Sequence, residues 1–159
     1  MPVDTRRTAF AAIVHPAIGI GPVRFGVFAR DVVAALGTPA ENRIDEDGDQ
    51  LLAYPEVGIS VFSFDHEEDM RLTTYELDRN SNAELWGLRV FRVPRSVISQ
   101  AVAARGLLFG PEQDFGGGET LFQLRSLGLD FYFEGEILSA LTAGVIFSAD
   151  DAIQWPTAT

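Results

Sequence analysis

Residues 51–62 read LLAYPEVGISVF, and residues 121–132 read LFQLRSLGLDFY. The two stretches align without a gap, apolar residues coincide at most positions, and Gly58 falls on Gly128. A second match lies upstream, where VAALG at 33–37 resembles VAARG at 102–106. Self-similarity at a nearly constant offset is the sequence signature of an internal repeat. We therefore predict a duplicated structural unit.

Each half of the chain combines one helical pattern with several strand patterns. Residues 28–36 carry apolar side chains on one helical face that ends at Gly37, and a second such face begins at Pro94 and ends at Gly106. Strand-like segments with short turns follow each helix, which favours antiparallel pairing. The predicted fold class is α+β: two repeated helix-plus-antiparallel-strand units, with the helices packed on one face of the sheet. Within one compact domain we expect an irregular lead-in at 1–23, a first unit at 24–93, a second unit at 94–147 and a C-terminal tail at 148–159.

The alignment also predicts which side chains share a face of the sheet. Residues 59 and 61 align with 129 and 131, so these apolar side chains should point toward the helices. The set expected to point away is Ser60, Phe62 and Phe64, aligned with Asp130, Tyr132 and Glu134. Aromatic and acidic side chains together are typical of a recognition surface. The alternative is that one half covers this face of the other, because Phe in a strand usually packs in a core.

Composition limits the classes of partner. The 159 residues carry a net charge of −11, which disfavours nucleic acid and anionic membranes and favours a basic partner. There is no cysteine, so disulfides and thiolate chemistry are excluded, and a cytoplasmic location is expected. The apolar stretch near the N-terminus is broken early by Pro16 and does not resemble a signal peptide, and no apolar run is long enough to span a membrane.

One acidic segment matches part of a calcium-binding loop. Asp45, Asp47, Asp49 and Glu56 occupy the spacing of ligand positions 1, 3, 5 and 12. Gln50, however, stands where the loop needs glycine, and strand-like residues follow where a helix is required. We therefore predict a polar hairpin turn here and no bound metal. The same reasoning assigns a solvated turn to residues 65–69, which read DHEED.

The sequence contains no recognisable catalytic machinery. It has two histidines, no lysine and no nucleophile elbow, and Gly116-Gly117-Gly118 is not followed by the residues of a phosphate-binding loop. We assign no catalytic residue and expect no cofactor. Whether the protein is an enzyme is left open, with a non-enzyme favoured, because paired carboxylates cannot be located from sequence alone.

Residues 21–39 read GPVRFG followed by an apolar helix that ends in Leu-Gly-Thr-Pro, and strand patterns continue at 50–54, 58–65 and 72–78. This arrangement resembles the SmpA/OmlA and β-lactamase-inhibitor-protein-like (BLIP-like) superfamily, with tandem units. The second unit departs from it, since Arg105-Gly106-Leu107 stands in place of the Leu-Gly-x-Pro motif. The resemblance implies a non-enzymatic binding module that grips another protein with an exposed sheet. The envelope members carry a signal peptide and a lipid-anchored cysteine, so the tandem β-lactamase inhibitor proteins are the better analogue.

The predicted function is a soluble bacterial protein-binding module, an inhibitor or immunity-type protein that uses an exposed sheet face. The expected contact residues are Phe62, Phe64, Trp86, Asp130, Tyr132 and Glu134. The alternative is a small-ligand-binding or hydrolytic domain with a pocket between the two units. The oligomeric state is not predicted.

Overall fold

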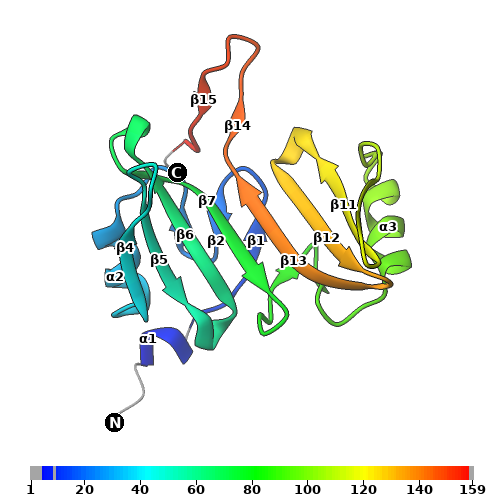
Figure 1. Ribbon diagram of the computed structural model, residues 1–159, viewed down its shortest axis with the longest axis horizontal. Helices are drawn as coiled ribbons and strands as arrows, with labels where there is room; N and C mark the ends of the chain where they lie inside the picture. The colour runs from blue at the N-terminus through cyan, green and yellow to red at the C-terminus, as the bar shows by residue number, and fades with distance from the viewer. Residues whose placement is uncertain (1–4, 9, 158–159) are drawn as a thin grey trace.

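One long antiparallel sheet dominates the molecule (Figure 1). The computed structural model describes residues 5–8 and 10–157. Eight strands follow one another across this sheet in the order β10-β11-β12-β13-β7-β6-β5-β4. The strands are β4 (Glu41–Ile44), β5 (Gln50–Tyr54), β6 (Ile59–Asp65), β7 (Arg71–Asp78), β10 (Gln113–Gly116), β11 (Glu119–Leu124), β12 (Leu129–Glu134) and β13 (Ile137–Gly144). Each set of four strands is a meander joined by short turns, and β7 pairs with β13 to make the sheet continuous.

Smaller elements surround this sheet. Three short strands form a second sheet behind it, in the segment predicted as an irregular lead-in: β1 (Val14–His15), β2 (Gly19–Ile20) and β3 (Val23–Arg24). Two hairpins are made by β8 (Glu84–Leu85) with β9 (Leu88–Arg89) and by β14 (Ile146–Phe147) with β15 (Ile153–Gln154). The β14–β15 hairpin follows the central strand β13 and projects beyond the strand ends of the main sheet (Figure 1). The α-helices are α1 (Thr5–Thr8), α2 (Ala29–Leu36) and α3 (Arg95–Ala104), and the 3-10 helices are η1 (Pro55–Val57), η2 (His66–Glu68) and η3 (Arg125–Leu127).

The core lies on one face of the long sheet. Alternating residues of the central strands, with interruptions at bulges, are buried there, together with Val32 and Leu36 of α2 and Ile98 and Val102 of α3. Two buried tyrosine hydroxyls donate hydrogen bonds to carbonyl groups, Tyr54 to Gly37 at 2.7 Å and Tyr75 to Gly19 at 2.9 Å. These bonds satisfy the polar ends of large side chains in the core.

The predicted α+β fold of two repeated helix-plus-antiparallel-strand units, with helices packed on one face, is wrong. The protein is mostly β, and the strands of both halves belong to one continuous sheet. Its longer helices have only 8 and 10 residues and lie near opposite ends of that sheet (Figure 1). The prediction failed because helical periodicity in a short segment does not tell how much of a sheet the helix covers.

The similarity between residues 51–62 and 121–132 has a local structural counterpart. In both places two strands flank a 3-10 helix that ends on a glycine in the left-handed conformation, Gly58 with φ 73° and Gly128 with φ 66°. The strands that follow differ, because β6 contains a bulge. Ile59 pairs with Leu77 and Val61 with Glu76, so Ser60 is an additional residue.

This bulge reverses the predicted orientation of the aromatic residues in β6. Phe62 and Phe64 are both fully buried, whereas we expected them on the opposite face. In β12 no such residue is inserted before Tyr132, and Phe131 and Phe133 are the buried pair. A gapless alignment cannot reveal an extra residue in one strand, because one residue shifts every later side chain to the other face.

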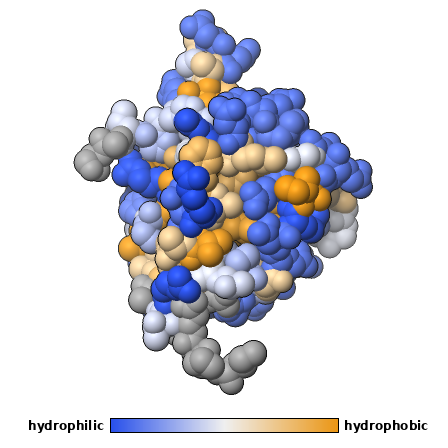
Figure 2. All heavy atoms as spheres, turned by 90° about the vertical axis from the view of Figure 1, so that its left-hand side faces the viewer, coloured by the Kyte–Doolittle hydropathy of each residue, from blue (hydrophilic) through white to orange (hydrophobic). Residues whose placement is uncertain are grey.

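Apolar atoms also reach the surface at the end of the sheet formed by β4 and α2. Figure 2 looks onto this end and shows orange and tan atoms between polar side chains. Ile44 of β4 is one of the exposed apolar residues, with 59% of its surface accessible. Among the described residues, no helix is both long and apolar enough to cross a membrane.

Candidate functional site

The face of the long sheet opposite the core is a candidate recognition surface, which we call the open face. Strand pairing places Gln123 opposite Asp130, Asp130 opposite Thr142 and Thr142 opposite Glu76. These four residues form one row across β11, β12, β13 and β7, and each is partly exposed. The row crosses the seam between β13 and β7, so both halves of the chain contribute to it.

A second row on the open face carries an aromatic side chain. Tyr132 lies between Leu121 on β11 and Ala140 on β13, and Ala140 pairs with Asp78 on β7. The ring of Phe115, from the edge strand β10, stacks on Tyr132 with 6.5 Å between the ring centroids. Phe115 is 57% exposed, so this aromatic pair remains accessible from solvent.

The open face is acidic, and its negative charges are poorly compensated. Partial burial and the neighbouring Asp78 carboxylate raise the pKa of Glu76. Partial burial raises the pKa of Tyr132 as well, and the charges of Asp130, Glu76 and Glu119 add to this effect. Like charges raise the pKa of acids because the ionised forms repel one another. A cation placed here would therefore be stabilised.

The polar groups of the open face hold one another in place. The Gln123 side-chain amide donates to Asp130 at 3.1 Å, and the Ser60 hydroxyl donates to Asp78 at 3.2 Å. Arg125 donates to Gln123 at 3.4 Å. The surface is therefore pre-organised, which lowers the entropy lost when a partner binds.

A groove of about 400 Å³ lies at one end of the seam. Thr74 of β7 and Thr142 and Gly144 of β13 contribute to it, together with Arg125 and the exposed ring of Phe147. Asp130 also lines the groove, so the polar row described above continues into it. Such a concave site with apolar walls and few polar groups can take up one projecting side chain of a partner.

The structure brings together only some of the predicted contact residues. Asp130 and Tyr132 lie on the open face, and Glu134 continues the same face of β12, where it forms an ion pair with Arg79. Phe62 and Phe64 have no exposed surface, so neither can contact a partner in this fold.

Trp86 lies in a different place, in the turn between β8 and β9. Its ring packs under the Arg105 guanidinium, 4.3 Å from the ring centroid, and its φ is 54°. The structure therefore does not add Trp86 to the open face.

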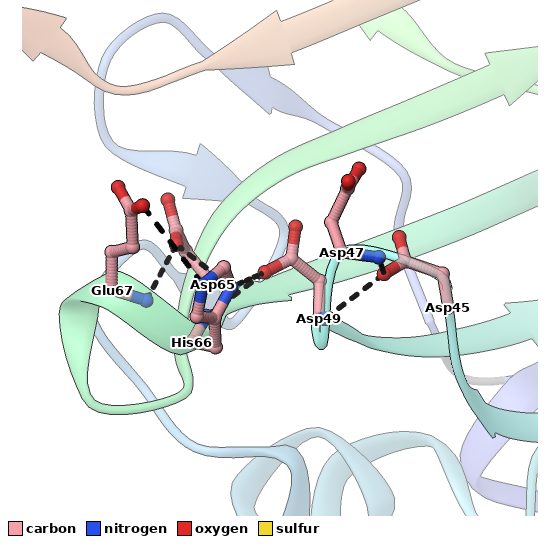
Figure 3. A network of polar contacts seen from close by, with 6 residues as sticks. All are labelled: Asp45, Asp47, Asp49, Asp65, His66 and Glu67. Atoms are coloured by element: carbon pink, nitrogen blue, oxygen red, sulfur yellow. Dashed lines mark hydrogen bonds and ion pairs between the residues drawn. The ribbon is translucent and has the colours of Figure 1, made fainter.

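The calcium-loop residues do not assemble into a metal site. Residues 45–49 form the hairpin turn between β4 and β5, as predicted. Asp45 accepts hydrogen bonds from the backbone N–H groups of Asp47 and Asp49, at 2.9 and 3.0 Å (Figure 3). Glu56 belongs to η1, at the other end of β5. Five strand residues separate Glu56 from the aspartates, roughly 17 Å of extended chain.

Asp49 of this turn instead forms a pair with His66 of η2, in the turn between β6 and β7. One Asp49 oxygen accepts hydrogen bonds from the His66 backbone N–H at 2.9 Å and from the ring Nδ1 at 2.7 Å (Figure 3). These bonds lower the pKa of Asp49, and the side-chain bond raises the pKa of His66. Asp65 lies close enough to complete a three-residue group, but its carboxylate accepts the backbone N–H of Glu67 at 2.8 Å. These hydrogen bonds link the β4–β5 turn to the β6–β7 turn.

Sequence reasoning missed the β7 side of the open face, Glu76 and Asp78. The alternation of polar and apolar residues in the sequence could have identified them, since Thr74, Glu76 and Asp78 alternate with buried residues in a strand that we predicted correctly at 72–78. The pairing of β7 with β13 was not available, because nothing local specifies which distant strands become neighbours.

Comparisons with known proteins do not assign the chain to a family. No protein-family model matches it, and neither the curated proteins nor the solved structures contain a match. The resemblance to BLIP-like proteins stays a prediction from sequence.

Proposed function

We propose that this protein is a non-enzymatic protein-binding module whose open face recognises a basic surface of another protein, in the manner of an inhibitor or immunity-type protein. The observation that carries the proposal is the row from Gln123 to Glu76, which is partly exposed, includes the carboxylates Asp130 and Glu76 and is shared by both halves of the sheet. The lack of cysteine supports a cytoplasmic location as part of this proposal.

Charge complementarity identifies the kind of partner. Arginine or lysine side chains entering the row would neutralise Glu76, Asp78 and Asp130 and relieve their mutual repulsion. The net charge of −11 would also accelerate encounter with a basic protein at low salt. Nucleic acid and anionic lipid would be repelled by the same field.

The aromatic groups supply the apolar part of the contact. Phe115 on the edge strand β10 is 57% exposed, Phe147 is 60% exposed where it lines the groove at the seam, and this groove offers a place for one partner side chain. Interfaces commonly combine exposed aromatic anchors with a polar surround.

The alternative function, a hydrolytic or small-ligand domain with a pocket between the halves, has weaker support. The groove at the seam contains one carboxylate, Asp130, and one cation, Arg125. Acid–base hydrolysis by carboxylates requires a pair of them in the same pocket. A broad acidic and aromatic face fits a protein partner better.

Site-specific photo-crosslinking tests the proposal without knowledge of the partner. A photoreactive phenylalanine analogue at position 132 or 142 should capture a basic protein in native cells. The same analogue at position 108 serves as the control, because Leu108 is 88% exposed and lies outside the open face. Equal capture from position 108, or no capture from the open face, would overturn the proposal.

The captured partner then allows a quantitative test. Asp130→Arg should weaken binding at least tenfold, because a buried like-charge contact at an interface costs more than about 1.4 kcal/mol. Glu46→Arg makes the same change of net charge in the exposed β4–β5 turn and should leave the affinity within about twofold. If both variants bind equally, the open face is not the contact surface.

A further inference from the structure

A second pocket, of about 350 Å³, shares no lining residue with the groove at the seam and contains two arginines. Arg24 stands at the end of β3 and Arg71 at the start of β7, while Trp155 and Pro156 follow β15 near the C-terminus. Backbone hydrogen bonds hold the segment after β3 against the start of β7, from Gly26 N–H to the Leu72 carbonyl and from Leu72 N–H to the Val27 carbonyl, at 2.9 and 2.8 Å. The arginines therefore project from a rigid part of the fold.

Arg71 has an unusual environment for this chain. Its Nε is buried and has no hydrogen-bond acceptor, and its guanidinium forms no ion pair with any described residue. Aromatic rings hold the guanidinium instead, with its Cζ 5.6 Å from the Trp155 ring centroid and 5.9 Å from that of Phe28. A buried N–H without an acceptor is costly, so such groups in native proteins usually indicate a missing partner.

Four of the described arginines form the ion pairs that Arg71 lacks, and Arg30, Arg92, Arg105 and Arg125 form none with a described residue. Acidic residues outnumber arginines 23 to 12, and ion pairs join Arg43 to Glu41, Arg79 to Glu134, Arg89 to Glu84 and Arg95 to Glu112. Arg24, the second arginine of the pocket, donates to the Thr157 carbonyl at 2.5 Å and forms no ion pair within the described part of the chain. Two arginines without a carboxylate thus meet in one pocket of a strongly acidic protein.

The walls of the pocket are apolar. Phe25, Val27, Pro156 and the Trp155 ring line it, and Trp155 packs directly on Gly26, where a Cβ would approach its ring carbon to 3.1 Å. Arg71 lines the pocket beside the Trp155 ring, and because its Nε is buried, its terminal N–H groups are the ones available to an anion there. The combination fits a ligand with an anionic group at one end and an apolar body.

We propose that this pocket binds a small organic anion, a carboxylate or phosphate ester carried on an apolar or aromatic body, with Arg71 as the principal contact and Arg24 as the second. The site is independent of the open face and adds a small-molecule ligand to a protein-binding module. It differs from a general electrostatic attraction, because the net charge of the protein repels anions and this pocket brings together two guanidinium groups that form no ion pair with a described carboxylate.

Fluorescence of Trp155 provides a direct readout. The chain has two tryptophans, so Trp86→Phe leaves Trp155 as the single reporter. Phenylacetate and phenyl phosphate are the anionic probes, inorganic phosphate tests the anion alone, and benzyl alcohol tests the apolar body alone. We expect saturable quenching by phenylacetate, by phenyl phosphate or by both, and the stronger probe identifies the anion. Neither benzyl alcohol nor inorganic phosphate should match the better anionic probe.

Matched variants locate the binding. Arg71→Gln should weaken binding at least tenfold, since it removes the charge-assisted hydrogen bonds to the anion. Arg43→Gln removes an equal charge from the exposed β4 strand and should have no effect. Asp130→Arg, which tests the open face, should bind the probes normally. The indole N–H signals of the wild-type protein in NMR spectra provide the same titration if Trp86→Phe does not fold.

No saturable response to either aromatic anion at 10 mM (about 2.7 kcal/mol of binding) would overturn the inference. Equal weakening by Arg71→Gln and Arg43→Gln would do so as well, because it would show a nonspecific charge effect.

Discussion

The turn regions β5–η1–β6 and β11–η3–β12 are built alike up to their glycines and then diverge. In β6 one additional residue after Gly58 places Phe62 in the core, whereas in β12 the unbroken strand places Tyr132 on the open face. A single inserted residue thus decides whether an aromatic side chain stabilises the fold or is available to a partner. Similar sequences guarantee a similar turn, but the register after it must be determined separately.

Truncation of Phe62 and of Tyr132 tests most directly whether the two aromatic side chains lie on opposite faces of the sheet. Phe62→Ala should lower the free energy of unfolding by about 3–5 kcal/mol, because it leaves a cavity in a fully buried region. Tyr132→Ala should cost about 1 kcal/mol or less, since the side chain is partly exposed. Urea unfolding of both variants measures the difference, and equal losses would show that the two strands present the same face.

Substitution of Gly58 and Gly128 tests the turn that the two regions share, a 3-10 helix that ends on a left-handed glycine. A Cβ at Gly58 would lie 2.1 Å from the Ser81 backbone nitrogen, and one at Gly128 would lie 2.3 Å from the Gly144 carbonyl oxygen. Both residues also have positive φ, so Gly58→Ala and Gly128→Ala should each cost at least about 2 kcal/mol. Gly116→Ala is the control, because its φ is 82° but no atom lies within 4 Å of the added Cβ. It should cost only about 1 kcal/mol, and a similar loss at all three sites would show that close packing is unimportant.

The charge on the open face gives a smaller, pH-dependent effect. The pKa of Glu76 is raised in the folded protein above 4.5, so its ionised form destabilises the fold and stability falls as pH rises through that raised pKa. Glu76→Gln should therefore make the protein slightly more stable at pH 7, and the gain should vanish below about pH 4. Thermal unfolding at both pH values measures this, with Glu46→Gln as an exposed control. A gain that persists at low pH would exclude ionisation as its cause.

The smallest effect concerns the contact of Figure 3, where His66 belongs to the turn between β6 and β7, and the corresponding turn between β12 and β13 has no histidine. The bond to Asp49 raises the pKa of His66 above 6.5, so its stabilisation is complete below pH 6.5 and is lost as pH rises through the raised value. The pKa of Asp49 is lowered below 3.8, and its contribution is lost only as pH falls through that value. NMR titration should show the His66 pKa returning toward 6.5 in Asp49→Asn. An unchanged pKa would mean that the pair does not form in solution.

Local structure was predictable from particular residues, and long-range structure was not. The strand at 50–54, the hairpin turn at 45–49 and both turn glycines follow from short-range patterns in the sequence. The buried orientation of Phe62 depends on a bulge, and the join between β7 and β13 depends on packing between distant segments. The anion pocket was also unpredictable, because its arginines and Trp155 lie far apart in the sequence. Asp130, Tyr132 and Glu134, whose strand has regular alternation, were placed correctly on the open face.

The join between β7 and β13 also has a consequence for the speed of folding. Each four-stranded meander forms through contacts between strands that follow one another in the sequence. Glu76 and Thr142, in contrast, pair although they are 66 positions apart in the sequence. The loss of chain entropy in closing so long a loop precedes any gain from the contact, so we expect the seam to form late. Folding of the two meanders would then come first and their union would limit the rate. The open face includes residues on both sides of the β7–β13 seam, so it would be among the last parts of the molecule to form.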